Sequence, residues 1–294
     1  MVLAATIDSP DALSIALAAH DYLTDPGLAT ALFCAVRLPQ PLLLEGEAGV
    51  GKTQAAKALA ATLNTPLLRL QCFEGIDASE ALYEWNYPRQ LLGIRLAEAQ
   101  GHGIDERSLF TREYLIERPL LRALEHPGPN PAVLLIDEVD RADEEFEAFL
   151  FELLAESTVT VPELGTLHAS HPPVVILTSN RTRDLHDALK RRCLYHWIDY
   201  PGLEQAIRIL QLRAPQLPPR LAAEVAGAVE RLRSLDLQKP PGIAEAIDWA
   251  RAAQLLGVEA LDETAVSRTL GSVLKYWEDQ ALARASGLAW VAGA

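Results

Sequence analysis

The chain has 294 residues, 49% of them hydrophobic, and its 26 basic and 40 acidic residues give a formal net charge of −14. This length and apolar content suit one large or two unequal packed domains and exclude extensive disorder. The negative charge disfavours a surface that binds nucleic acid by neutralising its phosphates, so we expect no nucleic-acid partner.

The cysteines and the N-terminal residues bear on the compartment. Cys34, Cys72 and Cys193 are odd in number and far apart, which gives no support to a disulfide framework or a zinc site. The first apolar run is interrupted by Asp8 and Asp11, and no stretch of about 18 uncharged apolar residues occurs. We therefore expect a cytoplasmic protein without a transmembrane segment.

Two amphipathic helices are expected before residue 40. Ser9-Pro10-Asp11 is typical of a helix start, and apolar residues follow at helical spacing up to His20. A second helix is expected over residues 28–36. It leads to a short apolar strand at Leu42–Leu44.

The strand runs into a Gly-rich turn with the Walker A spacing, Gly46, four intervening residues and then Gly51-Lys52-Thr53. In this motif backbone N–H groups close on a polyphosphate, the lysine reaches the β- and γ-phosphates, and the hydroxyl is a ligand for Mg²⁺. The strand before the motif and the Ala-rich helix expected after it, over residues 54–63, supply the context that the motif needs. The predicted residues for binding ATP are Gly46, Glu47, Ala48, Gly49, Val50, Gly51, Lys52 and Thr53, and Lys52 is also predicted to act in catalysis.

A second buried strand is expected at residues 67–70, and a segment rich in aromatic residues follows it. Tyr83, Trp85 and Tyr87 lie within five residues, with Phe73 before them. Such residues pack in cores or anchor interfaces, and both roles stay open here. A helix is expected over residues 115–124.

The apolar run 132–136 ends in Asp137 and Glu138, which is a Walker B pattern. A buried strand that ends in adjacent carboxylates is costly unless a cation lies there. Asp137 is predicted to hold Mg²⁺, directly or through water, and Glu138 to orient and deprotonate the attacking water.

A helix is expected over residues 144–156, followed by a hairpin whose strands, 158–161 and 166–168, flank Pro162–Gly165. The next strand, 174–179, delivers Asn180 to the sheet edge where Asp137 lies. Asn180 is predicted to hold the lytic water or to touch the γ-phosphate, with an ordinary turn residue as the alternative. A basic run, Lys190-Arg191-Arg192, precedes a fifth strand at 195–198.

Apolar strands that alternate with helices predict an α/β fold with a five-stranded parallel sheet covered on both faces. From residue 203 onward the apolar periodicity is helical, with Val266, Leu270, Val273 and Trp277 on one face of the last helix. We expect a nucleotide-binding αβα domain over residues 1–202 and a smaller all-helical lid domain over residues 203–294. Residues 286–294, small and uncharged, are expected to fray.

These motifs together resemble the AAA+ ATPases and, within them, the MoxR group. The resemblance covers nearly the whole chain and implies an ATPase that works as a ring of subunits, usually six, with ATP between neighbours. It assigns Asn180 as the sensor 1 residue and Arg192, with Arg191 as the alternative, as the arginine finger that reaches the adjacent subunit's γ-phosphate. The basic run could instead be a solvated patch.

One departure from the group lies in the lid. The group often carries a sensor 2 arginine at the start of the third lid helix, and the segment Lys239–Glu245 offers none. Lys239 and Arg251 are both candidates for that role, and the assignment stays open.

Four segments are similar in finer detail to the MoxR ATPases that accompany molybdenum- and copper-containing carbon monoxide dehydrogenase: 74–77, 83–87, 140–147 and 191–196. That resemblance implies a maturation chaperone for a metalloenzyme, with a von Willebrand factor A domain protein as partner. Two alternatives from other classes remain. One is a nucleic-acid motor or loader, which the charge disfavours, and the other is a nucleotide-gated scaffold with little hydrolysis, which the presence of Glu138 disfavours.

Overall fold

The computed structural model describes residues 7–38, 40–100, 105–156, 158–161, 164–169 and 171–293. By its internal contacts the chain forms two compact units, of which the first comprises Met1–Ala16, Pro26–Glu45 and Ala56–His196. The second comprises Leu17–Asp25, Gly46–Ala55 and Trp197–Ala294. The Gly-rich loop thus belongs to the second unit and the acidic strand end to the first. The expected domain boundary after residue 202 stays a prediction.

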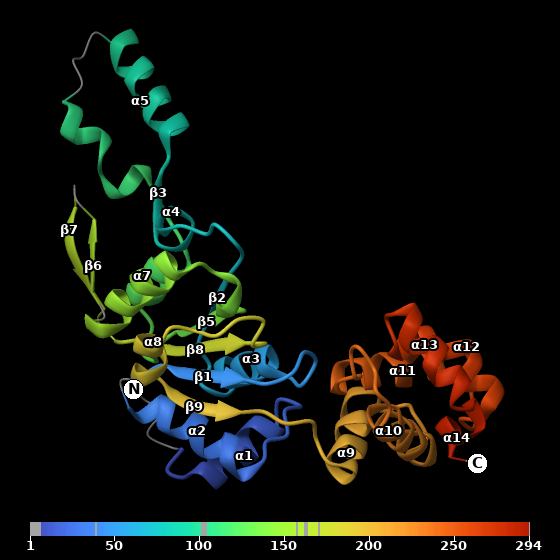
Figure 1. Cartoon of the computed structure of the whole chain (residues 1–294). Coiled ribbons are helices and arrows are strands. Elements are labelled where there is room, and N and C mark those ends of the chain that lie inside the picture. Colours follow the sequence, from blue (N-terminus) through green and yellow to red (C-terminus); the bar gives the residue numbers. More distant parts are fainter. Residues whose placement is uncertain are drawn as a thin grey trace. The chain divides into compact units, whose positions relative to one another are not determined.

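The first unit contains the five-stranded sheet that the sequence predicts, in the order β2-β5-β8-β1-β9 (Figure 1). Parallel pairing joins β2 to β5, β5 to β8 and β8 to β1. The strand bounds are β1 Leu42–Glu45, β2 Leu67–Gln71, β5 Val133–Asp137, β8 Val174–Ser179 and β9 Leu194–Trp197. The carboxyl ends of β5, β8 and β1 therefore meet at one edge, because parallel strands point the same way.

Helices cover both faces of the sheet. Every residue of β1, β5 and β8 is buried, and since successive side chains point to opposite faces, both faces must be covered. Helix α2, Pro26–Arg37, packs on β1 and β8, and α6, Pro119–Leu124, packs on β2 and β5. Other helices here are α1 Pro10–Ala18, α3 Lys52–Thr62, α7 Glu144–Glu156 and α8 Asp187–Arg192, with the short 3-10 turn η3 Val139–Arg141 after β5.

An insertion between β2 and α6 was not foreseen. Strands β3, Tyr83–Trp85, and β4, Leu115–Glu117, pair antiparallel at its base. The helix expected over 115–124 is wrong in its first half: α6 begins at Pro119, and Arg118 before it is extended, as a residue that precedes proline prefers to be. The other elements of the insertion are α4 Ala78–Ala81, α5 Tyr87–Ala99, η1 Glu106–Leu109 and η2 Arg112–Tyr114.

The predicted hairpin is confirmed. β6, Thr158–Val161, pairs antiparallel with β7, Gly165–His168. Two residues of its turn, Pro162 and Glu163, lie outside the described residues.

Beyond β9 the second unit is helical, as expected. Its helices are α9 Leu203–Arg213, α10 Pro219–Arg233, α11 Ile243–Leu255, α12 Glu263–Val273, α13 Trp277–Ala285 and α14 Leu288–Ala292. Two expectations are wrong. Helix α12 ends at Val273, so Trp277 begins a new helix with its side chain 77% exposed, and the tail does not fray, because α14 buries Val291. In the described ranges, none of the helices combines the length and the apolar run that crossing a bilayer requires.

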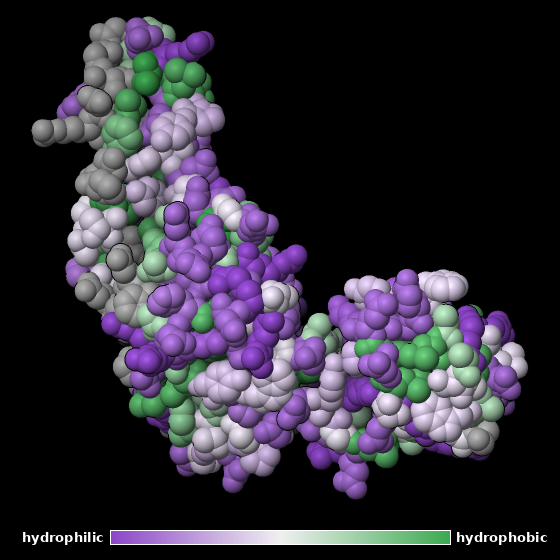
Figure 2. Space-filling view, in the orientation of Figure 1, coloured by the Kyte–Doolittle hydropathy of each residue, from purple (hydrophilic) through white to green (hydrophobic). Residues whose placement is uncertain are grey.

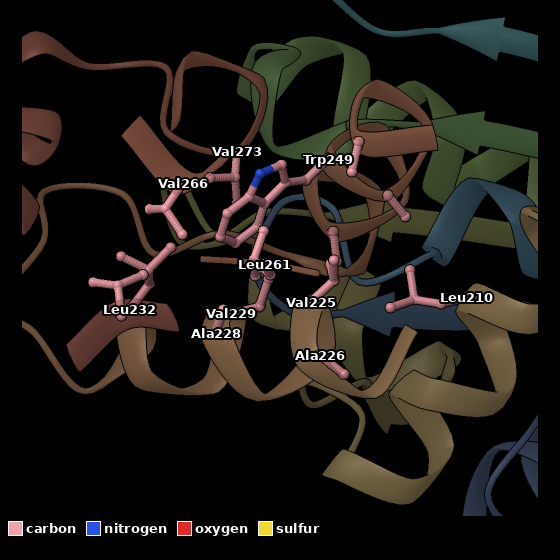
Figure 3. Packing of buried hydrophobic residues seen from close by; sticks show 14 of the residues in the cluster. Leu210, Val225, Ala226, Ala228, Val229, Leu232, Trp249, Leu261, Val266 and Val273 are labelled. Carbon is pink, nitrogen blue, oxygen red and sulfur yellow. The ribbon is translucent and has the colours of Figure 1, made fainter. Parts of the chain in front are cut away.

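Trp249 lies at the centre of the helical core (Figure 3). Its ring is fully buried, and its indole N–H donates to Thr269 Oγ1 at 2.6 Å. The hydroxyl of Thr269 donates in turn to the carbonyl of Ala265 at 2.6 Å. The only polar atom of the indole is therefore satisfied inside an apolar cluster.

Trp249→Ala is expected to lower the free energy of unfolding by about 3–5 kcal/mol, because it leaves a large cavity in the helical core. Trp277→Ala is the matched control, since loss of an exposed indole changes stability by about 0.5 kcal/mol or less. Urea denaturation followed by circular dichroism measures both. Equal destabilisation by the two variants would contradict the assignment of Trp249 to the core.

Candidate functional site

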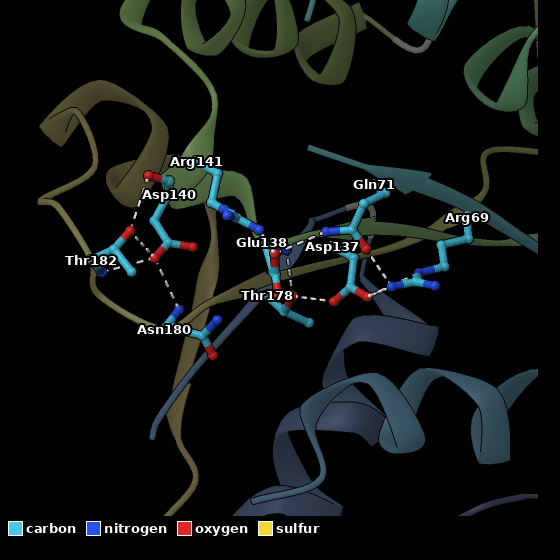
Figure 4. Close-up of polar contacts among 9 residues, drawn as sticks. All are labelled: Arg69, Gln71, Asp137, Glu138, Asp140, Arg141, Thr178, Asn180 and Thr182. Atoms are coloured by element: carbon cyan, nitrogen blue, oxygen red, sulfur yellow. Dashed lines mark hydrogen bonds and ion pairs between the residues drawn. The ribbon is translucent and has the colours of Figure 1, made fainter. Parts of the chain in front are cut away.

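The last residue of β5, Asp137, is a buried carboxylate with both oxygens engaged (Figure 4). Oδ1 accepts the Thr178 hydroxyl at 2.5 Å, and Oδ2 accepts Nε and Nη2 of Arg69 at 2.9 and 2.6 Å. Thr178 comes from β8 and Arg69 from β2, the two strands that flank β5. The negative charge of Asp137 is thus held by its neighbours in the sheet.

Glu138 follows directly and has a left-handed backbone, with φ 55° and ψ 50°. This conformation is uncommon for residues other than glycine and is found at functional sites. Its amide donates to Thr178 Oγ1 at 2.9 Å, and its Oε2 accepts Gln71 Nε2 and Arg141 Nη1, each at 3.0 Å. The left-handed turn thus directs the Glu138 carboxylate away from the line of β5, and Gln71 from β2 holds it there by a hydrogen bond.

Arg69 and Gln71 are site residues that the sequence reasoning missed. They alternate with apolar residues on β2 and so share one face of the strand. Gln71 is the register partner of Asp137, which places both polar side chains beside the carboxylates. Two polar residues at period two near the end of an apolar strand were the available signal, but only the strand order shows what they face.

Asp140, in η3, fixes the segment that follows β8. Its buried carboxylate accepts the amides of Asn180 and Thr182 at 3.2 and 2.8 Å and the Thr182 hydroxyl at 2.7 Å, all at Oδ2. These bonds hold the backbone of Asn180 at the end of β8, the neighbour of β5. The predicted sensor 1 residue therefore lies at the same edge of the sheet as Asp137 and Glu138.

The cluster of carboxylates affects a nearby thiol. Burial, together with the charges of Asp137, Asp140 and Glu138, raises the pKa of Cys72 to about 12. The thiol is therefore protonated at neutral pH and unsuited to a nucleophilic role. Burial is the larger cause of this shift, and the three carboxylates add to it.

Helix α8, which carries the predicted finger, is fixed at its N-terminus. The buried carboxylate of Glu147 on α7 accepts the amide of His186 at 2.8 Å and pairs with Arg183. His186 Nδ1 accepts the amide of Ala188 at 3.2 Å and caps the helix. Arg191 and Arg192 form the last turn of α8 and are both exposed.

The Gly-rich loop begins at the residue after β1. Gly49 and Gly51 have φ of 78° and 103°, backbone angles that residues with a Cβ rarely adopt. The glycines therefore let the loop turn its backbone as a phosphate cradle requires. Lys52 starts α3 and is buried, with Nζ donating to the carbonyls of Gly46 and Glu47 at 2.6 and 2.7 Å. Thr53 lies in the first turn of α3 and is half-buried. The other predicted loop residues are Ala48 and Val50, of which Val50 is buried.

Within the second unit, the N-terminus of α11 packs on this loop. The amide of Ala244 donates to the carbonyl of Gly49 at 3.1 Å. Glu245 Oε2 accepts the amide of Gly242 at 2.9 Å, which satisfies a free N–H at the helix start. The start of α11, where the resemblance places sensor 2, is therefore in contact with the loop through the backbone of Ala244.

A cationic residue that the sequence reasoning missed lies close by. The guanidinium of Arg233 lies 4.1 Å above the Tyr200 ring and donates through Nε to the carbonyl of Pro241 at 2.7 Å. Burial, and then the charge of Glu47, raises the pKa of the Tyr200 hydroxyl, so it stays a donor. Lys239 and Arg251 remain candidates for sensor 2, and Arg233 joins them, although nothing in its sequence context distinguishes it.

The residues present fit a nucleotide with Mg²⁺. The loop has left-handed glycines and a buried lysine ammonium, which suit a polyphosphate. The carboxylate of Asp137 and the hydroxyl of Thr53 are oxygen groups of the kind that Mg²⁺ prefers as ligands. The residue roles named from the sequence nevertheless stay predictions.

A parallel sheet with a Gly-rich loop after one strand and a carboxylate pair after another defines the class of P-loop proteins. Within that class the chain belongs to the AAA domains of the dynein-related subfamily, whose family model matches residues 41–193, more than half of the chain. The match covers the loop, both carboxylates, Asn180 and Arg192.

The similar curated proteins include two denitrification regulatory proteins named NirQ. The one from Pseudomonas aeruginosa is 26% identical over 227 residues, which cover 74% of this chain and 76% of that protein. The one from Stutzerimonas stutzeri is 25% identical over 203 residues, which cover 67% of this chain and 64% of that protein. An uncharacterized protein of Staphylococcus saprophyticus is 25% identical over 171 residues, covering 56% and 57%. The chain therefore matches less than two thirds of the length of the last two relatives.

Solved structures also show similarity over most of the chain. Domain III of the replication initiation protein DnaA from Thermotoga maritima has a TM-score of 0.48 and 15% identity, covering 86% of this chain and 95% of that chain. A Thermotoga maritima RuvB variant has the same TM-score and 17% identity, covering 83% and 66%.

Proposed function

We propose that the protein is an ATPase that binds ATP with Mg²⁺ and hydrolyses it. The observation that carries this proposal is the arrangement at the end of β5, where a buried Asp137 is followed by an outward-directed Glu138 with a left-handed backbone. A binding scaffold needs the first carboxylate, for the metal, but not the second. Membership of the AAA family supports the same conclusion.

Each residue has a proposed role in that reaction. Lys52 and the loop amides hold the phosphates, while Thr53 and Asp137 hold Mg²⁺, which neutralises charge on the phosphates when bound. Glu138 takes a proton from the attacking water, and Asn180 orients that water or the γ-phosphate. Arg192 is proposed to act on the nucleotide of a neighbouring subunit in a homo-oligomeric ring, which we expect to be a hexamer.

We further propose that hydrolysis drives the remodelling or maturation of a metalloenzyme, as in MoxR-type ATPases. Two relatives are named as regulatory proteins of denitrification, which is consistent with a role in support of another system. The client that the sequence resemblance favours is molybdenum- and copper-containing carbon monoxide dehydrogenase, with a von Willebrand factor A domain protein as partner. A nucleic-acid motor is the second candidate, and the net charge of −14 counts against it.

One set of measurements separates these functions. Phosphate release is measured for the purified protein alone, with double-stranded or single-stranded DNA, and with the purified dehydrogenase in its immature form. Stimulation by the dehydrogenase and not by DNA is the expected result. Stimulation by DNA alone would favour the motor, and nucleotide binding without turnover under all conditions would favour a scaffold.

The insertion after β2 carries surface suited to a client. Helix α5 exposes Tyr87 and three leucines, and Figure 2 shows apolar atoms among polar ones on this part of the first unit. Exposed aromatic and aliphatic side chains that are close together are typical of protein interfaces. The exposed leucines are Leu91, Leu92 and Leu96.

The aromatic residues of the insertion divide between core and surface. Trp85 is 7% exposed and packs edge-on against Phe110 and Tyr83, with ring centroids 5.2 and 6.1 Å apart. Tyr87, two residues on, is 62% exposed, and Phe73 is also exposed. Trp85 is therefore a core residue, and we propose the exposed Tyr87 as the better candidate for a client contact.

Tyr87→Ala is expected to melt like the wild type, keep basal hydrolysis and lose client binding by tenfold or more, the effect of an interface anchor. Trp85→Ala is the contrasting variant and is expected to lose about 3–5 kcal/mol of stability. Differential scanning calorimetry and a pull-down with the immature dehydrogenase measure these effects. Normal maturation by the Tyr87→Ala protein would place the client contact elsewhere.

A further inference from the structure

The ion pair between Arg69 and Asp137 is placed where the proposed metal ion would act. Arg69 donates twice to one oxygen, Asp137 Oδ2, from Nε at 2.9 Å and from Nη2 at 2.6 Å. The other oxygen accepts the Thr178 hydroxyl. The carboxylate side chain is 3% exposed, whereas that of Arg69 is 48% exposed.

A divalent cation and this guanidinium compete for the same charge. Asp137 carries one negative charge, and the two Arg69 N–H groups occupy both lone pairs of Oδ2, so a cation bound at that oxygen, directly or through water, would have to displace them. A guanidinium cannot lose its proton at neutral pH, so it can only move away. Two cations on one buried carboxylate would also repel each other.

Arg69 is able to move. It lies on β2, an edge strand of the sheet, and half of its side chain faces solvent. Its Nη2 also donates to Oε1 of Gln71, an alternative partner on the same strand. Asp137 has no such freedom, because it is buried at the end of β5, an interior strand, where loss of a cationic partner from its charge is costly.

We propose that Arg69 is a displaceable counter-cation of Asp137 and that it sets the Mg²⁺ concentration at which the nucleotide complex forms. Arg69 is a positioning residue in this account, because it acts through Asp137 and does not touch the nucleotide. Each metal-binding event must first break the ion pair, which weakens apparent metal affinity. The inference rests on the proposed function, in which Asp137 holds Mg²⁺.

The experiment uses the full chain and a binding readout that involves no turnover. A fluorescent, non-hydrolysable ATP analogue is held at fixed concentration while Mg²⁺ is titrated, and the Mg²⁺ midpoint is recorded. In Arg69→Gln the midpoint is expected to fall roughly tenfold, the scale of one hydrogen bond to a charged group. Affinity for the analogue in EDTA is expected to stay unchanged, because the proposed role of Arg69 is exerted on Asp137 and the metal ion.

Two further variants keep the result interpretable. Arg69→Lys retains the charge but cannot make the two-pronged contact, so its midpoint is expected between those of the wild type and Arg69→Gln. Arg112→Gln is the matched control, since it removes another exposed arginine that pairs with glutamates, Glu125 and Glu117, away from Asp137. Its midpoint is expected to equal that of the wild type.

Two outcomes of the Mg²⁺ titration would overturn the inference. An unchanged midpoint in both Arg69 variants shows that the pair does not limit metal binding, and a raised midpoint shows that Arg69 orients Asp137 for the metal. If Arg69→Gln fails to fold, Arg69→Lys alone decides. Failure of the proposed function is distinguishable: the wild type would not bind the analogue, or Asp137→Asn would leave the Mg²⁺ midpoint unchanged.

Discussion

Glu138→Gln is expected to bind ATP with near-normal affinity and to hydrolyse it about 10²–10⁴ times more slowly, the usual contribution of a general base. The amide has nearly the shape of the carboxylate but cannot accept a proton from water. The Glu138 carboxylate accepts hydrogen bonds from Gln71 and Arg141, and the exchange keeps every side chain of the Gly-rich loop, so the groups predicted to bind phosphate stay intact. Single-turnover hydrolysis and equilibrium nucleotide binding measure the two effects separately.

Lys52→Ala supplies the opposite phenotype and is the control. Its ammonium is buried over the loop, in contact with the carbonyls of Gly46 and Glu47. Its removal is expected to abolish measurable nucleotide binding, because no other side chain of the loop is cationic. Turnover by Glu138→Gln at the normal rate would show that another group activates the water.

The parts of the site that follow from local pattern were predictable. An apolar run before a Gly-rich turn or before two carboxylates is encoded within about ten consecutive residues, so β1, the loop and β5 needed no tertiary information. The parallel sheet followed from strands that alternate with helices. Asn180 was predicted correctly to lie at the sheet edge where Asp137 lies, because it follows a parallel strand, β8, that is a neighbour of β5.

The partners of the carboxylates were not predictable, because they depend on strand order and register. Arg69 lies 68 residues before Asp137, and only the adjacency of β2 and β5 brings them together. The same limit explains the error at residues 115–117: this apolar segment fits a helical period, but pairing with β3 decides its conformation. Short apolar runs are ambiguous until their partners are known.

The errors in the lid have a related cause. Val273 and Trp277 are four residues apart, the spacing of one helical face, yet the chain leaves the helix at Leu274 in an extended conformation. The small residues near the C-terminus were expected to fray on composition, but Val291 is buried in the core that contains Trp249. At the C-terminus, packing of α14 against α10 and α12 outweighs local propensity.

The arginine finger is the prediction with the other large expected effect. Arg192→Ala is expected to bind ATP normally and to lower hydrolysis by about 10³–10⁵-fold, the range for an arginine supplied by a neighbour. The residue is exposed at the end of α8, a short helix held by the buried Glu147, which presents its last turn to the surface. Arg191→Ala is the matched comparison, because it removes an adjacent exposed arginine; the larger loss identifies the finger.

Mixing subunits tests whether the finger acts on a neighbour. Lys52→Ala subunits lack a working phosphate site but keep Arg192, and Arg192→Ala subunits have the reverse defect. Each is expected to be inactive alone, whereas a mixed assembly places some intact loops beside intact fingers and regains hydrolysis in proportion to such pairs. Size-exclusion chromatography with light scattering confirms co-assembly in the same samples. Co-assembly without any recovery would mean that Arg192 acts within its own subunit or not on the nucleotide at all, because no other arrangement leaves two complementary defects uncorrected.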